Sequence, residues 1–433
     1  RKSLLQTSSR QEKADRLVVH QHVLCVLAVL TQAPRFYENF YWNLLWTWKR
    51  PKLDHSKLLV WQKVNHFSRA KELTRKDNLK KHLDKFVMLR GFKFASQFRI
   101  MPPTYVLPHQ FNAFLDSFTR ESKFKNNVWI TKPISSSRGR GISLLEEVND
   151  INYGEHLIVQ KYVCNPLLLR GYKFDLRLYV LVTSFLPLEA FIYNEGFARF
   201  CSVPFSLTDT HNLLVHLTNF AIQKYSATCP PMCDASNGPK LSLARLAQLL
   251  MTDLGVDWAE LWEKIVAVVL KTLVAVQDSM GREVNSFEVY GFDVLIDTEL
   301  RPWLLEVNAS PSMATDTDLD RTTKTALIND TVALVNPLPF DRMYLHHLVT
   351  ARLATGYWGN RAPKSKKEMK EVTQTHVASL LQGRSPRLYG ETPEVMGKYE
   401  KIAPSTSYEK VMRMKRAAFQ TRKSFRDQLP AVV

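Results

Sequence analysis

Apolar runs bounded by turn residues predict a series of strands in the first half of the chain. Their content of β-branched and aromatic residues, between Pro, Gly and Ser clusters, is typical of strands. The predicted strands are VWITKP (128–133), ISLL after the loop SSSRGRG (135–141), HLIVQKYV (156–163), YKFDLRLYVLVTS (172–184) and LEAFIY (188–193). Two further runs, 287–297 and 302–308, are joined by the short turn TELR and predict a hairpin.

Helical periodicity predicts helices over 68–90, 241–254 and 258–280, the last apolar enough to be mostly buried. A run of strands, then helices, then a strand pair and a further helix favours an α+β fold over a doubly wound sheet. The segment WNLLWTW at 42–48 is expected to be buried. Residues 355–410 are rich in Lys, Pro, Ser and Gly and are expected to be loosely ordered, whereas 409–427 has the spacing of a basic helix.

The composition is that of a globular chain with a core. The chain has 433 residues, of which 45% are hydrophobic, and no apolar run reaches the length of a transmembrane helix. HVLCVLAVL at 22–30 is expected to be a buried helix or strand rather than a signal sequence, although the first residue, Arg1, leaves targeting open. The sparse cysteines favour a reducing compartment, and Cys229 and Cys233 are interpreted as loop residues rather than zinc ligands.

The net charge of +18 indicates a polyanionic partner: nucleic acid, an anionic membrane or an acidic protein. Residues 337–433 carry 18 Lys and Arg against 8 Asp and Glu, a net charge of +10. A solvated basic tail without a partner is the alternative, and composition alone does not choose between them.

Polar residues interrupt the predicted hairpin at positions that face one another. FDVLID places Asp293 in one strand, and LLEVN places Glu306 and Asn308 on one face of the other, because side chains alternate along a strand. Three converging oxygen ligands suit Mg²⁺, which commonly shares its coordination with phosphates. A buried polar cluster satisfied by the backbone is the alternative.

Cationic residues follow earlier strands. Lys132 ends one strand just before the loop SSSRGRG, whose glycines allow close approach to phosphates and whose Arg138 and Arg140 add charge. KFDLR puts Lys173, Asp175 and Arg177 on one face of an otherwise apolar strand. These charges need ligands or one another, unless the strand is an edge strand with a solvated face. A surface lysine is the alternative for Lys132.

The order of these motifs carries more information than any one of them. The chain resembles the tubulin-tyrosine-ligase-like family of ATP-grasp ligases over about residues 40–336. The motifs that carry the resemblance are, in order, Lys132, RGRG, QKYV, KFDLR, FARF with Arg199, HLTN at 216–219, YGFDVLID and LLEVNASPS. VNHF (64–67) and LTRKDNL (73–79) resemble its N-terminal signature, and YEKIAP its C-terminal end.

The resemblance implies an ATP-grasp fold that clamps ATP between two α+β subdomains. The boundaries expected are an N-terminal subdomain at 1–90, a central subdomain at 91–185, a C-terminal subdomain at 186–336 and a basic extension at 337–433. It also implies roles for individual residues. The phosphates would be bound by Lys132 and Arg138, and the adenine would be lined by Gln160, Lys161 and Val163. The sugar and phosphates would lie next to Lys173 and Asp175, and the γ-phosphate and amino acid would face Arg177, Arg199, Thr218 and Asn219. Two Mg²⁺ would be held by Asp293, Glu306 and Asn308.

Family variation implies which amino acid is added. Tyrosine-adding relatives carry Gly-Ala-Pro after the metal-binding Asn, where this chain has Ala309-Ser310-Pro311, and glycine-adding relatives tend to have HLCN where it has HLTN. Both differences favour a tubulin polyglutamylase that uses ATP, Mg²⁺ and glutamate on acidic tubulin tails. A tubulin glycylase, a glutamylase of another protein, and a catalytically inactive microtubule-binding module are the alternatives.

The same resemblance places the protein in the cytoplasm and cytoskeleton, with cilium, flagellum or basal body as further sites. A membrane partner is not expected. A nucleic-acid partner is not expected either, because the stacking aromatics and motifs that accompany such binding are missing beside the basic charge.

Overall fold

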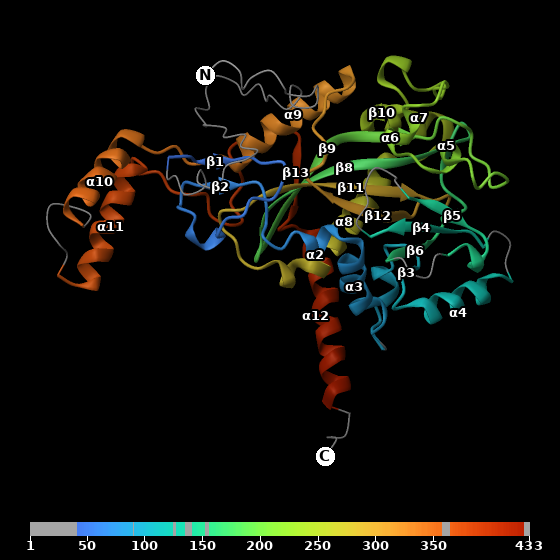
Figure 1. The fold of residues 1–433 in the computed structure, drawn as a ribbon, viewed down its shortest axis with the longest axis horizontal. Coiled ribbons are helices and arrows are strands. Elements are labelled where there is room, and N and C mark those ends of the chain that lie inside the picture. Colours follow the sequence, from blue (N-terminus) through green and yellow to red (C-terminus); the bar gives the residue numbers. More distant parts are fainter. Residues whose placement is uncertain are drawn as a thin grey trace.

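The computed structural model describes residues 41–89, 91–123, 127–134, 141–151, 156–356 and 364–427. The fold is of the α+β type, as the order of elements predicted, and two antiparallel sheets dominate it (Figure 1). The expectations for 22–30 and for the Arg138 and Arg140 loop lie outside the described residues. Among the described helices, none is both long and apolar enough to cross a membrane.

The larger sheet has the path β10-β9-β8-β11-β12, with β13 paired to β9 and β7 to β8. Every pairing in it is antiparallel. Its strands are β7 (Leu168–Leu169), β8 (Tyr172–Phe185), β9 (Leu188–Phe200), β10 (Lys240–Ser242), β11 (Glu288–Ile296), β12 (Pro302–Ala309) and β13 (Tyr399–Ala403). Because β8 and β9 are neighbours, this sheet continues across the subdomain boundary expected at residue 185.

The smaller sheet has the order β3-β6-β4-β5 and lies beside the β8, β11 and β12 end of the larger one (Figure 1). Its strands are β3 (Thr104–Val106), β4 (Trp129–Pro133), β5 (Ser143–Leu145) and β6 (Leu157–Lys161). The helix α4 (Phe111–Glu121) packs against it, with Phe114 and Trp129 in edge-to-face contact at 5.2 Å between ring centroids. A third, two-stranded sheet pairs β1 (Leu44–Leu45) with β2 (Lys63–Val64), and both leucines of β1 are buried. The burial expected for 42–48 holds for most of the segment but not for Trp48, which is 48% exposed.

Helices cover both faces of the larger sheet. The helix α8 (Trp258–Met280) buries one long face against β8, β9 and β12, together with α7 (Leu243–Leu254). On the other face α9 (Asp318–Val335) packs Leu327 and Ile328 against Tyr179 and Phe191 of the sheet. The capping residues fit local sequence: Asp257 caps the start of α8, and Ser242 caps the start of α7.

The helix predicted over 68–90 is two helices, α2 (Lys71–Thr74) and α3 (Lys76–Val87). Arg75 between them has an extended backbone, φ −82° and ψ 126°, which ends α2 and starts α3. Its guanidinium donates to Asp77 in the first turn of α3. The break makes Lys76 the first residue of α3.

The expectation of loose order over 355–410 is wrong for part of this stretch. The structure has α11 (Lys366–Leu380) and β13 within it, and α10 (Arg342–Thr355) ends where it begins. The predicted basic helix is present as α12 (Thr406–Asp427), which packs on α8 and extends away from the body of the molecule (Figure 1). The strand β13 was not predicted, because it lies in a lysine-rich and proline-rich stretch and has few buried residues: Tyr399, Ile402 and Ala403.

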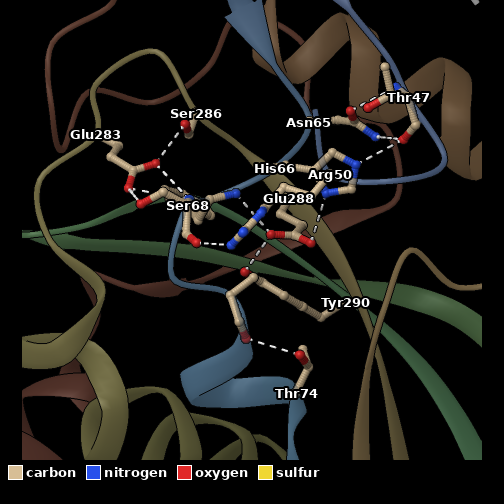
Figure 2. A network of polar contacts seen from close by, with 12 residues as sticks. Thr47, Arg50, Asn65, His66, Ser68, Thr74, Glu283, Ser286, Glu288 and Tyr290 are labelled. Atoms are coloured by element: carbon tan, nitrogen blue, oxygen red, sulfur yellow. Dashed lines mark hydrogen bonds and ion pairs between the residues drawn. The ribbon is translucent and has the colours of Figure 1, made fainter. Parts of the chain in front are cut away.

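Two carboxylates, the buried Glu288 and the partly buried Glu283, fasten the N-terminal segment to β11 and to the residues just before it (Figure 2). Glu288 accepts hydrogen bonds from the Tyr290 hydroxyl (2.8 Å) and the Phe67 amide (3.0 Å), and lies 3.3 Å from His66 Nδ1. Burial disfavours the charged form of Glu283, but hydrogen bonds from His55 and Ser68 outweigh it and lower its pKa to about 2. The network therefore holds the chain that leads into α2 and α3 against the strand that carries Asp293.

Candidate active site

A cleft opens between the two larger sheets, with about 860 Å³ of empty space when the solvent at its mouth is included. Most of the residues selected from the sequence line it: Lys132, Gln160, Lys161, Val163, Lys173, Asp175, Arg199, Thr218, Asn219, Asp293 and Glu306. Of the others, Arg177 and Asn308 contact Asp293 from beside the cleft, and Arg138 lies outside the described residues.

Charged side chains form cross-strand pairs on the cleft face of the larger sheet. Asp175 on β8 lies opposite Arg199 on β9, and Arg177 on β8 lies opposite Asp293 on β11. Arg199 donates two hydrogen bonds to Asp175, at 2.7 and 2.6 Å, and Arg177 donates two to Asp293, at 2.5 and 3.0 Å. Because β8 lies between β9 and β11, the alternative of a solvated edge strand is wrong, and these charges are satisfied by one another.

The hairpin of β11 and β12 brings the predicted oxygen ligands together. Asp293 lies directly opposite Glu306 in the pairing register, next to a bulge. Asn308 Nδ2 donates to Glu306 Oε1 at 3.1 Å and lies 3.5 Å from Asp293 Oδ2. Burial raises the pKa of Asp293, but the charges of Arg177 and Arg199 outweigh it and lower that pKa well below its usual range. Asp293 is therefore ionised at neutral pH.

Cations face this hairpin from the other side of the cleft. Lys132, at the end of β4, donates to Gln160 Oε1 at 2.7 Å. Burial lowers its pKa to about 8, with repulsion from Lys76 and Lys173 adding to the shift and attraction from Glu306 opposing it. The pKa of Lys132 thus lies close to neutral pH. An anion placed in the cleft would favour the charged form of this lysine.

Lys173 is held by the Tyr162 side chain and the His216 backbone. Its Nζ donates to the Tyr162 hydroxyl and to the His216 carbonyl, both at 2.8 Å, and lies 4.4 Å from the centroid of the Tyr162 ring. The Tyr162 hydroxyl is also 2.9 Å from His216 Nδ1, and His216 Nε2 is 2.8 Å from the Asp209 carbonyl. Burial lowers the pKa of Lys173. This chain of contacts fixes where the ammonium of Lys173 enters the cleft.

Lys161 is oriented differently from its neighbours. Its side chain forms an ion pair with Glu121 (2.9 Å) and donates to Asn127 (2.8 Å), so its ammonium points toward α4 and the start of β4. Only the body of Lys161 and the backbone around it are left to line the cleft.

Sequence reasoning gave no role to Lys76, Tyr162 or His216, all of which line the cleft. Lys76 Nζ lies 2.8 Å from Glu306 Oε2. The signal was present in the motifs themselves, because Lys76 lies within LTRKDNL, Tyr162 within QKYV and His216 at the start of HLTN.

The cleft is lined by both carboxylates and ammonium groups in an α+β fold. Comparison with known proteins gives the family of the chain. The model of the tubulin-tyrosine ligase family matches residues 52–344. This chain belongs to the tubulin-tyrosine ligase family.

Several relatives of this chain carry the names of tubulin polyglutamylases. The chain is similar to tubulin polyglutamylase ttll6 of Danio rerio, 34% identical over 397 residues that cover 88% of this chain and 49% of the relative. It is 38% identical to the probable tubulin polyglutamylase TTLL2 of Homo sapiens, over 68% of this chain and 50% of the relative. It is also 38% identical to tubulin polyglutamylase TTLL5 of Homo sapiens, over 68% of this chain and 23% of the relative. The chain thus spans half or less of the length of these relatives.

Proposed function

We propose that this protein is an ATP-dependent ligase that joins glutamate to glutamate side chains of acidic tubulin tails. The proposal rests on membership of the family and on relatives whose names are those of tubulin polyglutamylases. Its fold would be an ATP-grasp fold in which the β3–β6 sheet and the larger sheet enclose the nucleotide. In this arrangement 1–90 and 91–185 would form the N-terminal and central subdomains, 186–336 the C-terminal one, and 337–433 the basic extension.

One observation carries the proposal: carboxylates and ammonium groups face one another across a single cleft. Asp293 and Glu306 lie on one wall, and Lys132 and Lys173 lie with them in the lining. A triphosphate with its divalent cations presents the complementary charges, because cations of the protein meet phosphate oxygens and carboxylates meet the metal.

The donor set fits Mg²⁺. Within the described ranges no three His, Cys, Asp or Glu side chains gather closely enough to form a metal site by themselves. The carboxylates of Asp293 and Glu306 nevertheless supply hard oxygen donors next to one another, which suits an ion that shares its coordination with phosphates and water. Asn308 would add its amide oxygen if the amide, whose nitrogen faces the two carboxylates, turned around. Bound there, Mg²⁺ would neutralise charge on the phosphoryl group. Two ions are proposed.

The remaining residues would act on nucleotide and amino acid. Lys132 and Arg138 would bind phosphates, Gln160, Lys161 and Val163 would line the adenine, and Lys173 and Asp175 would lie at the sugar and phosphates. The side chains of Arg177, Arg199, Thr218 and Asn219 would face the γ-phosphate and the incoming amino acid.

The reaction needs no nucleophile from the protein. A carboxylate oxygen of the acceptor attacks the γ-phosphorus of ATP, which releases ADP and leaves an acyl phosphate. The amine of the incoming glutamate then attacks the acyl carbon, phosphate leaves, and the amine loses its proton as the amide forms. Fixed cations stabilise the charge that develops on the transferring phosphoryl group. The partners would be tubulin and glutamate, and the site of action the cytoplasm and cytoskeleton, including cilium, flagellum or basal body.

The test is incubation of the protein with microtubules, ATP, Mg²⁺ and each labelled amino acid in turn, with the tails read by mass spectrometry. Glutamate is expected to be added and the other amino acids not. Addition of glycine would replace the proposal with a glycylase. Modification of another acidic protein but not of tubulin would replace the acceptor, and no ligation with retained microtubule binding would identify an inactive binding module.

Glu306→Gln is the matched variant, because it keeps the shape of the side chain and removes one charge. We expect ligation to fall by at least about 10²-fold, a typical loss when electrostatic stabilisation is removed, with an unchanged melting temperature. Near-normal turnover would show that Glu306 is not a metal ligand.

A further inference from the structure

A cationic groove lies at the other end of the strand that carries Glu306. It is bounded by η3 (Ala95–Phe98), by α8 and by the turn that leads into β12. Four cations line it: Arg99, Lys264, Lys271 and Arg301. Glu299 is the one acidic residue among the described lining residues, so the groove has a clear excess of positive charge.

These cations lack compensation from the protein. In the part of the chain that the structure describes, no ion pair joins any of the four to a carboxylate. Arg301 stacks on the ring of Trp303, 3.9 Å from its centroid, and donates to the Arg99 carbonyl at 2.6 Å, so its position is fixed without an acidic partner. Burial lowers the pKa of Lys271, and the charge of Arg301 lowers it further. Like charges held close together without a counterion are costly unless an anion arrives.

The groove and the cleft share two segments of chain. Ile100 lines the groove and Pro102 lines the cleft, and Leu304 donates a backbone hydrogen bond to Ile100 at 2.8 Å. On β12, Pro302 lines the groove and Glu306 lines the cleft. Pro302 and Glu306 are four positions apart, about 13 Å at the usual rise per residue. The helix α8 packs on the sheet face of Leu176 and Val294, opposite the face that carries Asp175 and Asp293. A bound peptide would therefore pass around the edge strand β12 and span at least this distance, which takes about four extended residues or more.

We propose that the cationic groove binds an acidic stretch of the acceptor polypeptide, about four or more residues from the carboxylate that reacts in the cleft. The inference rests on the proposed function and adds to it a second contact surface for the substrate. A peptide is favoured over a nucleic acid because none of the described lining residues is aromatic, and stacking on aromatic rings is the usual companion of cationic grooves that hold single-stranded nucleic acid.

The test uses a fluorescent peptide of ten consecutive glutamates and measures its binding by anisotropy. The variant Lys264→Gln/Lys271→Gln removes two cations of the groove and leaves Arg301 on Trp303. The matched control, Lys366→Gln/Lys367→Gln, removes two exposed cations from α11, far from the groove in the fold. We expect the groove variant to bind the peptide about tenfold more weakly at low salt, as for two partly screened charge contacts, and the control to bind it within about twofold of the original protein.

Acceptor length provides the second measurement. In the ligation assay the groove variant should raise the KM for a ten-residue acidic acceptor and leave kcat unchanged, while acceptors of three residues, too short to span about 13 Å, should show no difference from the original protein. Unchanged peptide binding in the groove variant, or an equal loss for short and long acceptors, overturns the proposal. So does tighter groove-dependent binding of an oligonucleotide or of inorganic phosphate than of the peptide.

The two proposals fail separately. Suppose that the original protein ligates glutamate and that the groove variant does so with an unchanged KM for long acceptors. The proposed role of the groove is then wrong, and the proposed function is kept. If no amino acid is ligated but the peptide binds in a groove-dependent way, the function is wrong and the groove stands.

Discussion

Lys76, the first residue of α3, places its ammonium 2.8 Å from the carboxylate of Glu306 on β12. The two residues are 230 positions apart in the sequence, and both line the cleft. A cation from the N-terminal segment is therefore part of the candidate active site, next to a proposed metal ligand.

Lys76→Gln is expected to lower ligation by about 10-fold to 10²-fold, because a fixed positive charge next to the reacting phosphates is lost. Stability should change by no more than about 1 kcal/mol, since the ion pair is only partly buried. Steady-state kinetics and urea unfolding measure the two effects. Lys81→Gln, an exposed lysine on the same helix, is the control, and equal activities of the two variants would exclude a role for Lys76 in the reaction.

Lys132 predicts a pH limit for ATP binding. Burial lowers its pKa to about 8, and only the protonated ammonium attracts phosphate. Affinity for ATP should therefore be constant below about pH 8 and fall as pH rises above it. Isothermal titration at several pH values measures this. In Lys132→Arg the guanidinium stays charged throughout this range, so the fall should disappear, and a fall of the same size in that variant would assign the titration to another group.

The lowered pKa of Lys132 affects folding stability in the direction opposite to its effect on ATP affinity. Between pH about 8 and 10.5 the lysine is neutral in the folded protein and protonated in the unfolded chain. The unfolded state then binds more protons, so this lysine contributes stability that rises with pH across that window.

Arg199 is expected to be essential for stability. It is buried and bound at two points to Asp175, with Nη2 also 2.9 Å from Asp293. Arg199→Ala would leave two buried carboxylates short of a partner, and breaking a buried pair typically costs about 3–5 kcal/mol. Urea unfolding of Arg199→Ala measures the loss, and Arg199→Ala/Asp175→Ala should recover part of it. A loss below about 1 kcal/mol would contradict the buried geometry.

Arg177 is the better probe of the amino-acid site, because it lies beside the cleft and is more exposed than Arg199, 18% against 9% of its side chain. If it binds the carboxylate of the incoming glutamate, Arg177→Gln should raise the KM for glutamate more than the KM for ATP. Equal changes in both constants, or a loss confined to ATP, would remove that assignment. Arg177→Lys, which keeps a charge, should be intermediate.

The C-terminal segment is part of the fold and also carries charge. Truncation after residue 355 would remove β13 from the larger sheet and α12 from α8, so we expect no cooperative melting transition in the product. The buried Lys415 of α12 forms an ion pair with the exposed Asp278 of α8 (2.8 Å) and belongs to this packing.

Arg413, Arg422 and Lys423 are exposed on α12, so changing all three to Gln tests the charge without removing the helix. Weaker microtubule binding with a shallower salt dependence is expected, while ligation onto a short free acidic peptide stays unchanged. Co-sedimentation at several salt concentrations measures it. Binding as tight as that of the original protein would show that α12 is not the anchor.

Much of the fold and of the site followed from local pattern. Alternation along β8 put Lys173, Asp175 and Arg177 on one face, and the short turn between β11 and β12 placed Asp293 near Glu306. Both inferences rest on the period of two in a strand and on the closeness of hairpin partners, which a few residues of sequence contain.

Contacts between distant segments were decided only by the tertiary structure. The position of β8 inside the sheet satisfies Arg177 and Asp175 with partners from β11 and β9, which the strand's own sequence does not reveal. Lys76 reaches Glu306 because Arg75 breaks the predicted helix and because Glu283 and Glu288 fasten the N-terminal segment to β11. The strand β13 forms within a charged, proline-containing stretch because the edge of β9 provides its hydrogen bonds. The spacing of apolar residues and the composition predict whether a residue of a helix or strand is buried or exposed. Its partner across a sheet or cleft is set by the packing of elements that can be hundreds of residues apart in the sequence.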